Sequence, residues 1–284
     1  MRIGDGQFQY EVIPDWGRGP EIPAFGLVSG VACDSQDRVY VFIRLPQPEV
    51  LVFDPDGRLR DRWGRDVFKK PHGIWVSPDD HLYLTDLVDH AVYKTTLDGQ
   101  VVMTLGTPGQ PGAPGMPFNQ PTRAVESPSG DIFVSDGYGQ NRAHRFTATG
   151  ERVVSWGETG KGHGQFELPH DITVDRQERV YILDRPNGRC QIFNNRGGFQ
   201  TEWSGFLVPA DLFIAPDETF YIAEMAQRMS MLNRDGELLA RWGQKGDKPG
   251  QFSDSPHGIW VDSRGDLYVS EVLTENRLQK FMRV

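Results

Sequence analysis

The sequence lacks the features that mark secreted, membrane-spanning and nucleic-acid-binding proteins. No run of 18 apolar residues occurs, so no segment is predicted to cross a membrane. The first residues, MRIGDGQFQYEVIPDWG, contain no basic stretch followed by an apolar one, so we expect no signal peptide and a cytoplasmic protein. The net charge of −9 argues against nucleic acid as a partner, because phosphate binding needs a basic surface.

Cysteine is also scarce. Cys33 and Cys190 are the only two, and they lie far apart in the sequence. Two isolated cysteines in a chain of this size are typical of free thiols in a reducing compartment, although a single disulfide would fit the same count.

The sequence has no helical spacing of apolar residues, but it has an internal repeat. The recurring phrase is a proline-containing start, an apolar strand, a polar turn, an aromatic strand ending in an acid, a third strand, a glycine turn and a strand ending in Trp-Gly. The six starts lie near residues 28, 71, 121, 169, 209 and 256. This spacing of roughly 40–50 residues is that of a four-stranded propeller blade. We therefore predict an all-β, six-bladed β-propeller, with residues 1–284 as a single domain.

The sixth copy stops before its outer strand. The missing piece is found at the other end of the chain, where residues 7–17, QFQYEVIPDWG, resemble an outer strand with its Trp-Gly ending. We expect this N-terminal strand to complete blade six, because closing the ring leaves no unpaired strand edge at the junction.

One position of the repeat carries a histidine in every second blade. The residue after the initial proline, which is replaced by Val28 in blade one, is in order Ser29, His72, Thr122, His170, Ala210 and His257. Alternate blades of a six-fold ring lie about 120° apart, so three imidazoles are predicted to converge and bind a metal with one position open, as in catalytic zinc sites. Zinc is favoured, and iron, copper and nickel also suit imidazole. Alternatively, each histidine only supports a turn. The other histidines are predicted to be solvated: His81, His90, His144 and His163.

A second ring of residues ends the next strand of each blade: Arg44, Asp86, Asp136, Asp184, Glu224 and Glu271. Repeated acids often accept hydrogen bonds from nearby backbone. A second hypothesis is that four of them, Asp86, Asp136, Asp184 and Glu271, accept the other N–H of the metal-bound imidazoles.

Three residues near these acids depart from the repeat. Arg44 replaces the acid in blade one, and Tyr138 and Arg185 follow the acids of blades three and four. Tyr138 could act as a general base or acid near a cation, and the two arginines could bind a substrate carboxylate. The alternatives are rim packing for the tyrosine and ion pairs with the ring acids for the arginines.

The blade phrase resembles the NHL repeat. More specifically, the segments VSGV, PHGI, QPTRAV, VSDGYGQNR, GQFELPHDI and DRPNGR resemble the peptidyl-α-hydroxyglycine α-amidating lyases, or peptidylamidoglycolate lyases. The likeness runs from about Phe25 to the end of the chain and is weakest in blade five.

This resemblance implies both the metal and its chemistry. The zinc ligands of the family fall on His72, His170 and His257, its catalytic tyrosine on Tyr138, and its active-site arginines on Arg44 and Arg185. In the family reaction the C–N bond of an α-hydroxyamide breaks to give an amide and glyoxylate. A Lewis acid and a tyrosine base are suited to removing the hydroxyl proton.

The chain departs from the family at two places that bear on calcium and disulfides. Gly258 follows the third histidine where the family has an acid that helps hold calcium. The backbone carbonyls of Val28 and Ile74 match the remaining calcium positions, but without that carboxylate the resemblance supports Ca²⁺ only weakly. Gly139 stands where a family half-cystine is expected.

Three functions remain open at this point. The first is a metal-dependent lyase acting on an α-hydroxyamide, with a small-molecule or peptide-derived carboxylate as its substrate. The second is a related amide, ester or lactone hydrolase, which the same residues would serve. The third is a non-enzymatic NHL scaffold. The sequence does not predict the oligomeric state.

Overall fold

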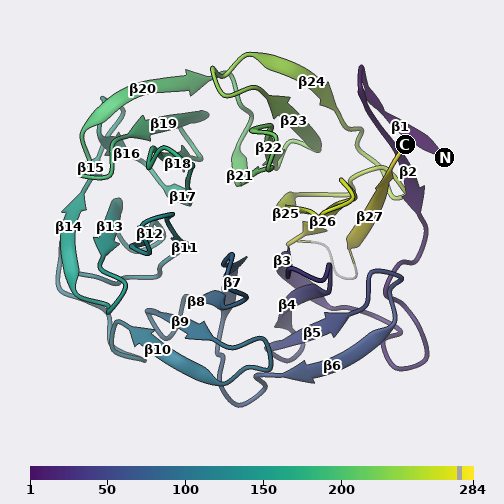
Figure 1. Cartoon of the computed structure of the whole chain (residues 1–284), viewed down its shortest axis with the longest axis horizontal. Helices are drawn as coiled ribbons and strands as arrows, with labels where there is room; N and C mark the ends of the chain where they lie inside the picture. The colour runs from purple at the N-terminus through teal and green to yellow at the C-terminus, as the bar shows by residue number, and fades with distance from the viewer. Residues whose placement is uncertain (274–276) are drawn as a thin grey trace. The chain divides into compact units, whose positions relative to one another are not determined.

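Six antiparallel sheets make up nearly all the regular structure of the chain. The computed structural model describes residues 1–273 and 277–284. Within them every element is a strand, and no helix has the length and apolarity that crossing a bilayer demands. The order of strands is that of an all-β, six-bladed β-propeller, as the sequence predicts (Figure 1). The contacts divide the chain into two compact units, so the single domain over 1–284 stays a prediction.

The first unit, Met1–Asp66 with Ala210–Val284, holds blades one, five and six. Blade one comprises β3 (Leu27–Cys33), β4 (Val39–Leu45), β5 (Glu49–Phe53) and β6 (Leu59–Trp63). Blade five comprises β21 (Pro209–Ile214), β22 (Phe220–Glu224), β23 (Arg228–Leu232) and β24 (Leu238–Trp242). Blade six comprises β25 (Pro256–Val261), β26 (Leu267–Glu271) and β27 (Leu278–Arg283), joined by β2 (Phe8–Ile13) and β1 (Arg2–Asp5).

The second unit, Val67–Pro209, holds blades two, three and four. Blade two comprises β7 (Pro71–Val76), β8 (Leu82–Asp86), β9 (Ala91–Thr95) and β10 (Val101–Leu105). Blade three comprises β11 (Arg123–Glu126), β12 (Ile132–Asp136), β13 (Arg142–Phe146) and β14 (Arg152–Trp156). Blade four comprises β17 (Pro169–Val174), β18 (Val180–Asp184), β19 (Arg189–Phe193) and β20 (Phe199–Ser204). A short parallel pair, β15 (Glu158–Thr159) and β16 (Gln165–Phe166), lies between blades three and four in the sequence.

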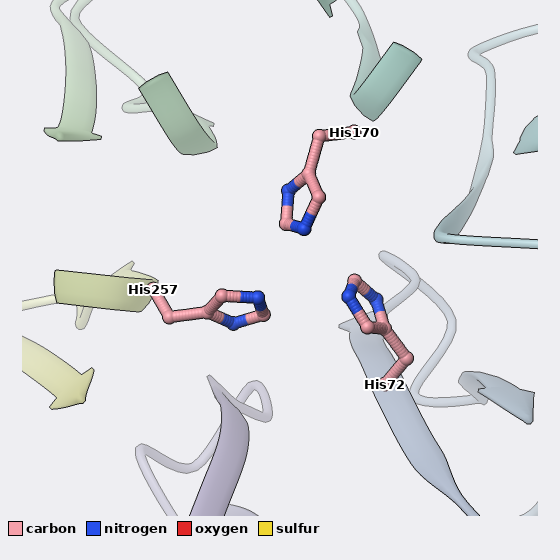
Figure 2. Close-up of side chains that lie close together, drawn as sticks. All are labelled: His72, His170 and His257. Carbon is pink, nitrogen blue, oxygen red and sulfur yellow. The ribbon is translucent and has the colours of Figure 1, made fainter. Parts of the chain in front are cut away.

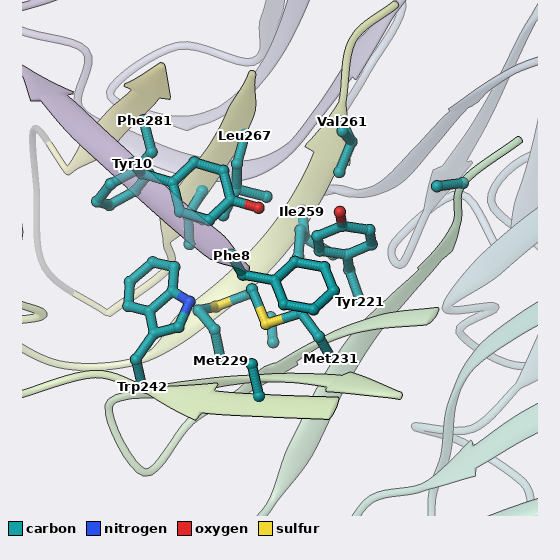
Figure 3. Close-up of a cluster of buried hydrophobic side chains, with 14 of the residues drawn as sticks. Phe8, Tyr10, Tyr221, Met229, Met231, Trp242, Ile259, Val261, Leu267 and Phe281 are labelled. Carbon is teal, nitrogen blue, oxygen red and sulfur yellow. The ribbon is translucent and has the colours of Figure 1, made fainter. Parts of the chain in front are cut away.

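The N-terminal strand closes blade six, as predicted. Strand β2 pairs antiparallel with β27, with Tyr10 opposite Arg283 and Val12 opposite Phe281. The alternation along β2 buries Phe8, Tyr10 and Val12 and leaves Glu11 exposed. These side chains enter the core shared with blade five, where the Phe8 ring meets Tyr221 edge to face at 6.0 Å (Figure 3). The two ends of the chain therefore stabilise one sheet.

Replacing Phe8 with alanine should cost about 3 kcal/mol of unfolding free energy, because a buried ring is lost from this closing strand. Urea unfolding followed by circular dichroism measures the change. Glu11→Ala on the exposed face of the same strand is the matched control, with an expected change within about 0.5 kcal/mol. Equal stability of the two variants would contradict the closure.

Candidate functional site

The three predicted histidines share one backbone environment. His72 on β7, His170 on β17 and His257 on β25 each follow the strand's first proline and are 2%, 2% and 4% exposed. The pairing register of each strand shifts just there: between Pro71 and Ile74, between Pro169 and Asp171, and between Pro256 and Gly258. A β-bulge leaves a residue out of the ladder and redirects its side chain. The local sequence thus removes each histidine from regular strand pairing.

Two of these imidazoles have a fixed tautomer. His72 Nδ1 lies 2.7 Å from the carbonyl oxygen of Thr122, and His257 Nδ1 lies 2.8 Å from that of Ser29. A carbonyl oxygen only accepts hydrogen bonds, so Nδ1 carries the proton and Nε2 presents its lone pair. A metal-binding histidine is commonly held in this way.

Within the second unit, a tyrosine joins two of the histidines. The rings of His72 and His170 meet edge to face with centroids 4.8 Å apart, and their candidate ligand nitrogens lie within 4.8 Å of each other (Figure 2). The Tyr138 hydroxyl lies 3.3 Å from His72 Nε2 and 3.2 Å from His170 Nε2. The structure therefore brings a phenol directly to the lone-pair side of two buried imidazoles.

Arg185 completes this cluster. Its Nη2 donates to the Tyr138 hydroxyl at 3.3 Å, and its guanidinium carbon lies 5.5 Å from the centroid of the tyrosine ring. Tyr138 itself is 37% exposed, so its ring is reachable from solvent although its hydroxyl group contacts the buried His72 and His170. A positive charge beside a phenolic oxygen stabilises negative charge that develops on it. The second unit thus combines a base candidate, a cation and two metal-ligand candidates.

Arg44 lies in the first unit, near the end of β4, and is half-buried. Its predicted role in binding substrate stays a prediction.

The ring acids Asp86, Asp136, Asp184 and Glu271 fix the loops that lead into their blades. All are fully buried, and each accepts backbone N–H groups from the segment leading into its blade. The donors are Lys69 and Lys70 for Asp86, Asn119 for Asp136, Glu167 and Leu168 for Asp184, and Asp254 for Glu271. A buried carboxylate that accepts several such bonds fixes the backbone around it. These acids therefore set the course of the chain just before each inner strand.

The hypothesis that these acids accept the second imidazole N–H is wrong for Asp86 and Glu271. His72 and His257, in the same two blades, donate instead to the backbone carbonyls of the neighbouring blades. Asp136 and Asp184 likewise bind groups of their own blade and its entry loop.

His144 is not a solvated residue, contrary to the prediction. It is fully buried on β13, with Nδ1 2.7 Å from Ser155 Oγ and Nε2 3.2 Å from Asp136 Oδ2. His144 pairs with Val134, two residues before Asp136, and so lies on the same face of the sheet as that ring acid. Of the other three, His163 is exposed and stacks on Phe199 with centroids 4.1 Å apart, and His81 and His90 are partly exposed.

The position after the third histidine has no room for a side chain. A Cβ added to Gly258 would lie 2.8 Å from the Gly30 Cα and 2.6 Å from Ser270 Oγ. An acid there would therefore require the backbone to move. Val28 and Ile74, the other calcium candidates, are fully buried strand residues, and their role stays a prediction. At the matching position of blades three and four, a buried ion pair joins Arg123 Nε to Asp171 Oδ1 at 3.4 Å, which the sequence analysis missed.

Comparison with known proteins places the chain in a family. No protein-family model matches it. Over 258 residues it is 30% identical to the NHL repeat-containing protein 3 of Mus musculus, covering 83% of this chain and 73% of that protein. The chain belongs to the NHL-repeat family. The sequence prediction of NHL repeats is confirmed.

Other relatives of this NHL-repeat protein carry the name of an enzyme. The chain is 34% identical to the peptidyl-alpha-hydroxyglycine alpha-amidating lyase 1 of Drosophila melanogaster, and the match covers 82% of this chain and 48% of that protein. It is 29% identical to the peptidylglycine alpha-amidating monooxygenase of Rattus norvegicus, covering 97% of this chain but about a third of that protein's length, 32%. These relatives support a lyase family.

Solved structures agree on the fold alone. A putative gluconolactonase superimposes with a TM-score of 0.71 at 12% identity, covering 96% of this chain and 92% of that one.

Proposed function

We propose that this NHL-repeat protein is a metal-dependent lyase that cleaves the C–N bond of an α-hydroxyamide, of the peptidyl-α-hydroxyglycine type, into an amide and glyoxylate. One observation carries the proposal: the Tyr138 hydroxyl lies against the Nε2 atoms of His72 and His170 and accepts a hydrogen bond from Arg185. A structural scaffold has no need of a phenol and a guanidinium at this place. The lyase names of two relatives, one from Drosophila melanogaster and one from Caenorhabditis elegans, support the same reaction.

The donor set fits a divalent metal. Three buried histidines each offer one imidazole nitrogen, and the hydrogen bonds of His72 and His257 leave Nε2 unprotonated. We propose His257 as the third ligand because it shares the bulge and the carbonyl contact of His72. Zinc is the favoured ion, with iron, copper and nickel as alternatives. The metal would supply Lewis acidity toward the substrate hydroxyl.

The protein's own side chains then move one proton. Tyr138, as its ionised form, takes the proton from the substrate hydroxyl, and the electron pair of that O–H bond forms the carbonyl of glyoxylate. The C–N bond breaks, and the amide nitrogen accepts a proton, so the atoms balance without water. Arg185 stabilises the charge on the tyrosine oxygen, and Arg44 with Arg185 is proposed to hold the substrate carboxylate.

The direct test is an assay of zinc-loaded protein with N-benzoyl-α-hydroxyglycine, a simple α-hydroxyamide. We expect glyoxylate to be released with enzyme turnover and the release to stop when a chelator removes the metal. A protein that contains its full metal complement but releases no glyoxylate above the uncatalysed rate would refute the proposed reaction.

A further inference from the structure

A polar cavity adjoins Tyr138 within the second unit. Its volume is about 570 Å³, and its walls come from three segments of that unit, residues 112–119, 137–142 and 158–168. Tyr138 and Arg142 both line it, and Gly115 forms part of the wall beside Arg142. A substrate that places its hydroxyl at Tyr138 therefore has room to extend into this cavity.

Arg142 differs from the arginines that occupy the same position in three other blades. The first residue of the third strand pairs with the ring acid in blades three, four and five. In blade four Arg189 Nε donates to Asp184 at 3.1 Å, and in blade five Arg228 forms an ion pair with Glu224 at 2.7 Å. In blade six Arg277 Nε donates to Glu271 at 2.8 Å. In those three blades the guanidinium binds the ring acid of its own blade and so serves the fold.

In blade three other groups take the place of the guanidinium on the acid. Asp136 accepts hydrogen bonds from Gln140 Nε2 at 2.6 Å and from the backbone of Asn119, and His144 lies at 3.2 Å. Through the parts of the chain that the structure describes, the Arg142 guanidinium makes no hydrogen bond and no ion pair. The half-buried side chain instead lies at the cavity wall. Gln140 and His144 have thus replaced Arg142 as partners of the acid.

The wall around Arg142 keeps the guanidinium accessible. A Cβ at Gly115 would lie 3.4 Å from its Nη2, so any larger residue there would cover it. Gln140 fixes this glycine in place, accepting from the Gly115 backbone N–H at 3.0 Å and donating to the Met116 carbonyl at 2.8 Å. Glu158 and Glu167 also line the cavity, but both are exposed, so water screens their charge.

We propose that this cavity binds the acyl portion of the substrate, the part that leaves as the amide, and that Arg142 selects acyl groups bearing a carboxylate. A half-buried guanidinium without a protein partner gains a charge-assisted, two-pronged contact when a carboxylate reaches it. This inference rests on the proposed function for the placement of the reacting end at Tyr138. It assigns Arg142 to specificity, with no part in the proton transfer.

Binding of unreactive ligands tests the inference without any turnover. Calorimetric titration of metal-loaded protein would compare N-glutarylglycine with N-pentanoylglycine, which has the same length but no acyl carboxylate. We expect the glutaryl ligand to bind at least about tenfold more tightly to the wild type. Arg142→Gln should abolish this preference and leave the affinity for the pentanoyl ligand unchanged. Its melting temperature should match that of the wild type, since no protein contact is lost.

Arg176→Gln is the matched control, because it removes an equal charge from an exposed turn of the same unit, between β17 and β18, that does not line the cavity. That variant should keep the preference. Equal affinity for both ligands in the wild type, absent binding of both, or a preference that persists in Arg142→Gln would each overturn the role of Arg142. A preference that depends on Arg142 in a protein that releases no glyoxylate would instead overturn the lyase reaction and leave the binding site standing.

Discussion

Tyr138→Phe should lower kcat for glyoxylate release by about 100- to 10,000-fold, the range typical of losing a general base. The phenyl ring would keep its edge-to-face packing on His72 and His170, with centroids 5.2 and 5.7 Å away, so the site should keep its shape. Only the oxygen that reaches both Nε2 atoms and Arg185 disappears. Steady-state kinetics with N-benzoyl-α-hydroxyglycine measure the effect, together with metal content, which we expect to be unchanged.

A second tyrosine provides the control. Tyr93→Phe removes a hydroxyl that donates to Asp89 at 2.9 Å, in the same unit but within the body of blade two. This change should cost about 1 kcal/mol of stability and leave kcat within about twofold of the wild type. Wild-type turnover by Tyr138→Phe would show that the phenol takes no proton and would favour a different base.

His170→Ala should lower the affinity for zinc by more than about 100-fold, because a loss of direct coordination exceeds the 10- to 100-fold cost of disturbing the groups that orient a ligand. Its candidate ligand nitrogen lies within 4.8 Å of that of His72, in the same unit. Elemental analysis after dialysis should find about one zinc per chain in the wild type and almost none in the variant, with turnover lost in parallel.

His163→Ala is the histidine control. His163 is exposed and stacks on Phe199, and it lies outside the inner strands that carry His72, His170 and His257. The variant should retain its zinc and its activity. His257→Ala then tests the proposed third ligand separately, with the same loss of zinc as His170→Ala. A full zinc complement in both variants would contradict the histidine site.

The fold was predictable because each copy of the sequence repeat corresponds to one blade. Proline and the bulge recur at the same place in blades two, four and six, so the sequence position of His72, His170 and His257 translates directly into a common structural position. The closure by Phe8–Ile13 was predictable in the same way, since the sixth repeat lacks a strand that the N-terminus supplies.

The roles of the polar residues were harder to predict because they depend on partners distant in sequence. Asp86 accepts hydrogen bonds from the backbone N–H groups of Lys69 and Lys70, and no pattern within a blade predicts these partners. Similarly, Arg142 ends the segment VSDGYGQNR. Its guanidinium is left without an acid partner because Gln140 and His144 contact the Asp136 carboxylate instead. Such competition among hydrogen-bond donors is decided only when the loops are in place.

The acyl product formed from N-benzoyl-α-hydroxyglycine tests the central claim most directly, because glyoxylate alone does not separate the two enzymatic hypotheses. A hydrolase would yield benzoate and α-hydroxyglycine, which itself decomposes to ammonia and glyoxylate. The lyase reaction keeps the nitrogen on the acyl group. Chromatography with mass detection should therefore find benzamide and glyoxylate in equal amounts, without benzoate. Benzoate and ammonia in place of benzamide would contradict the account.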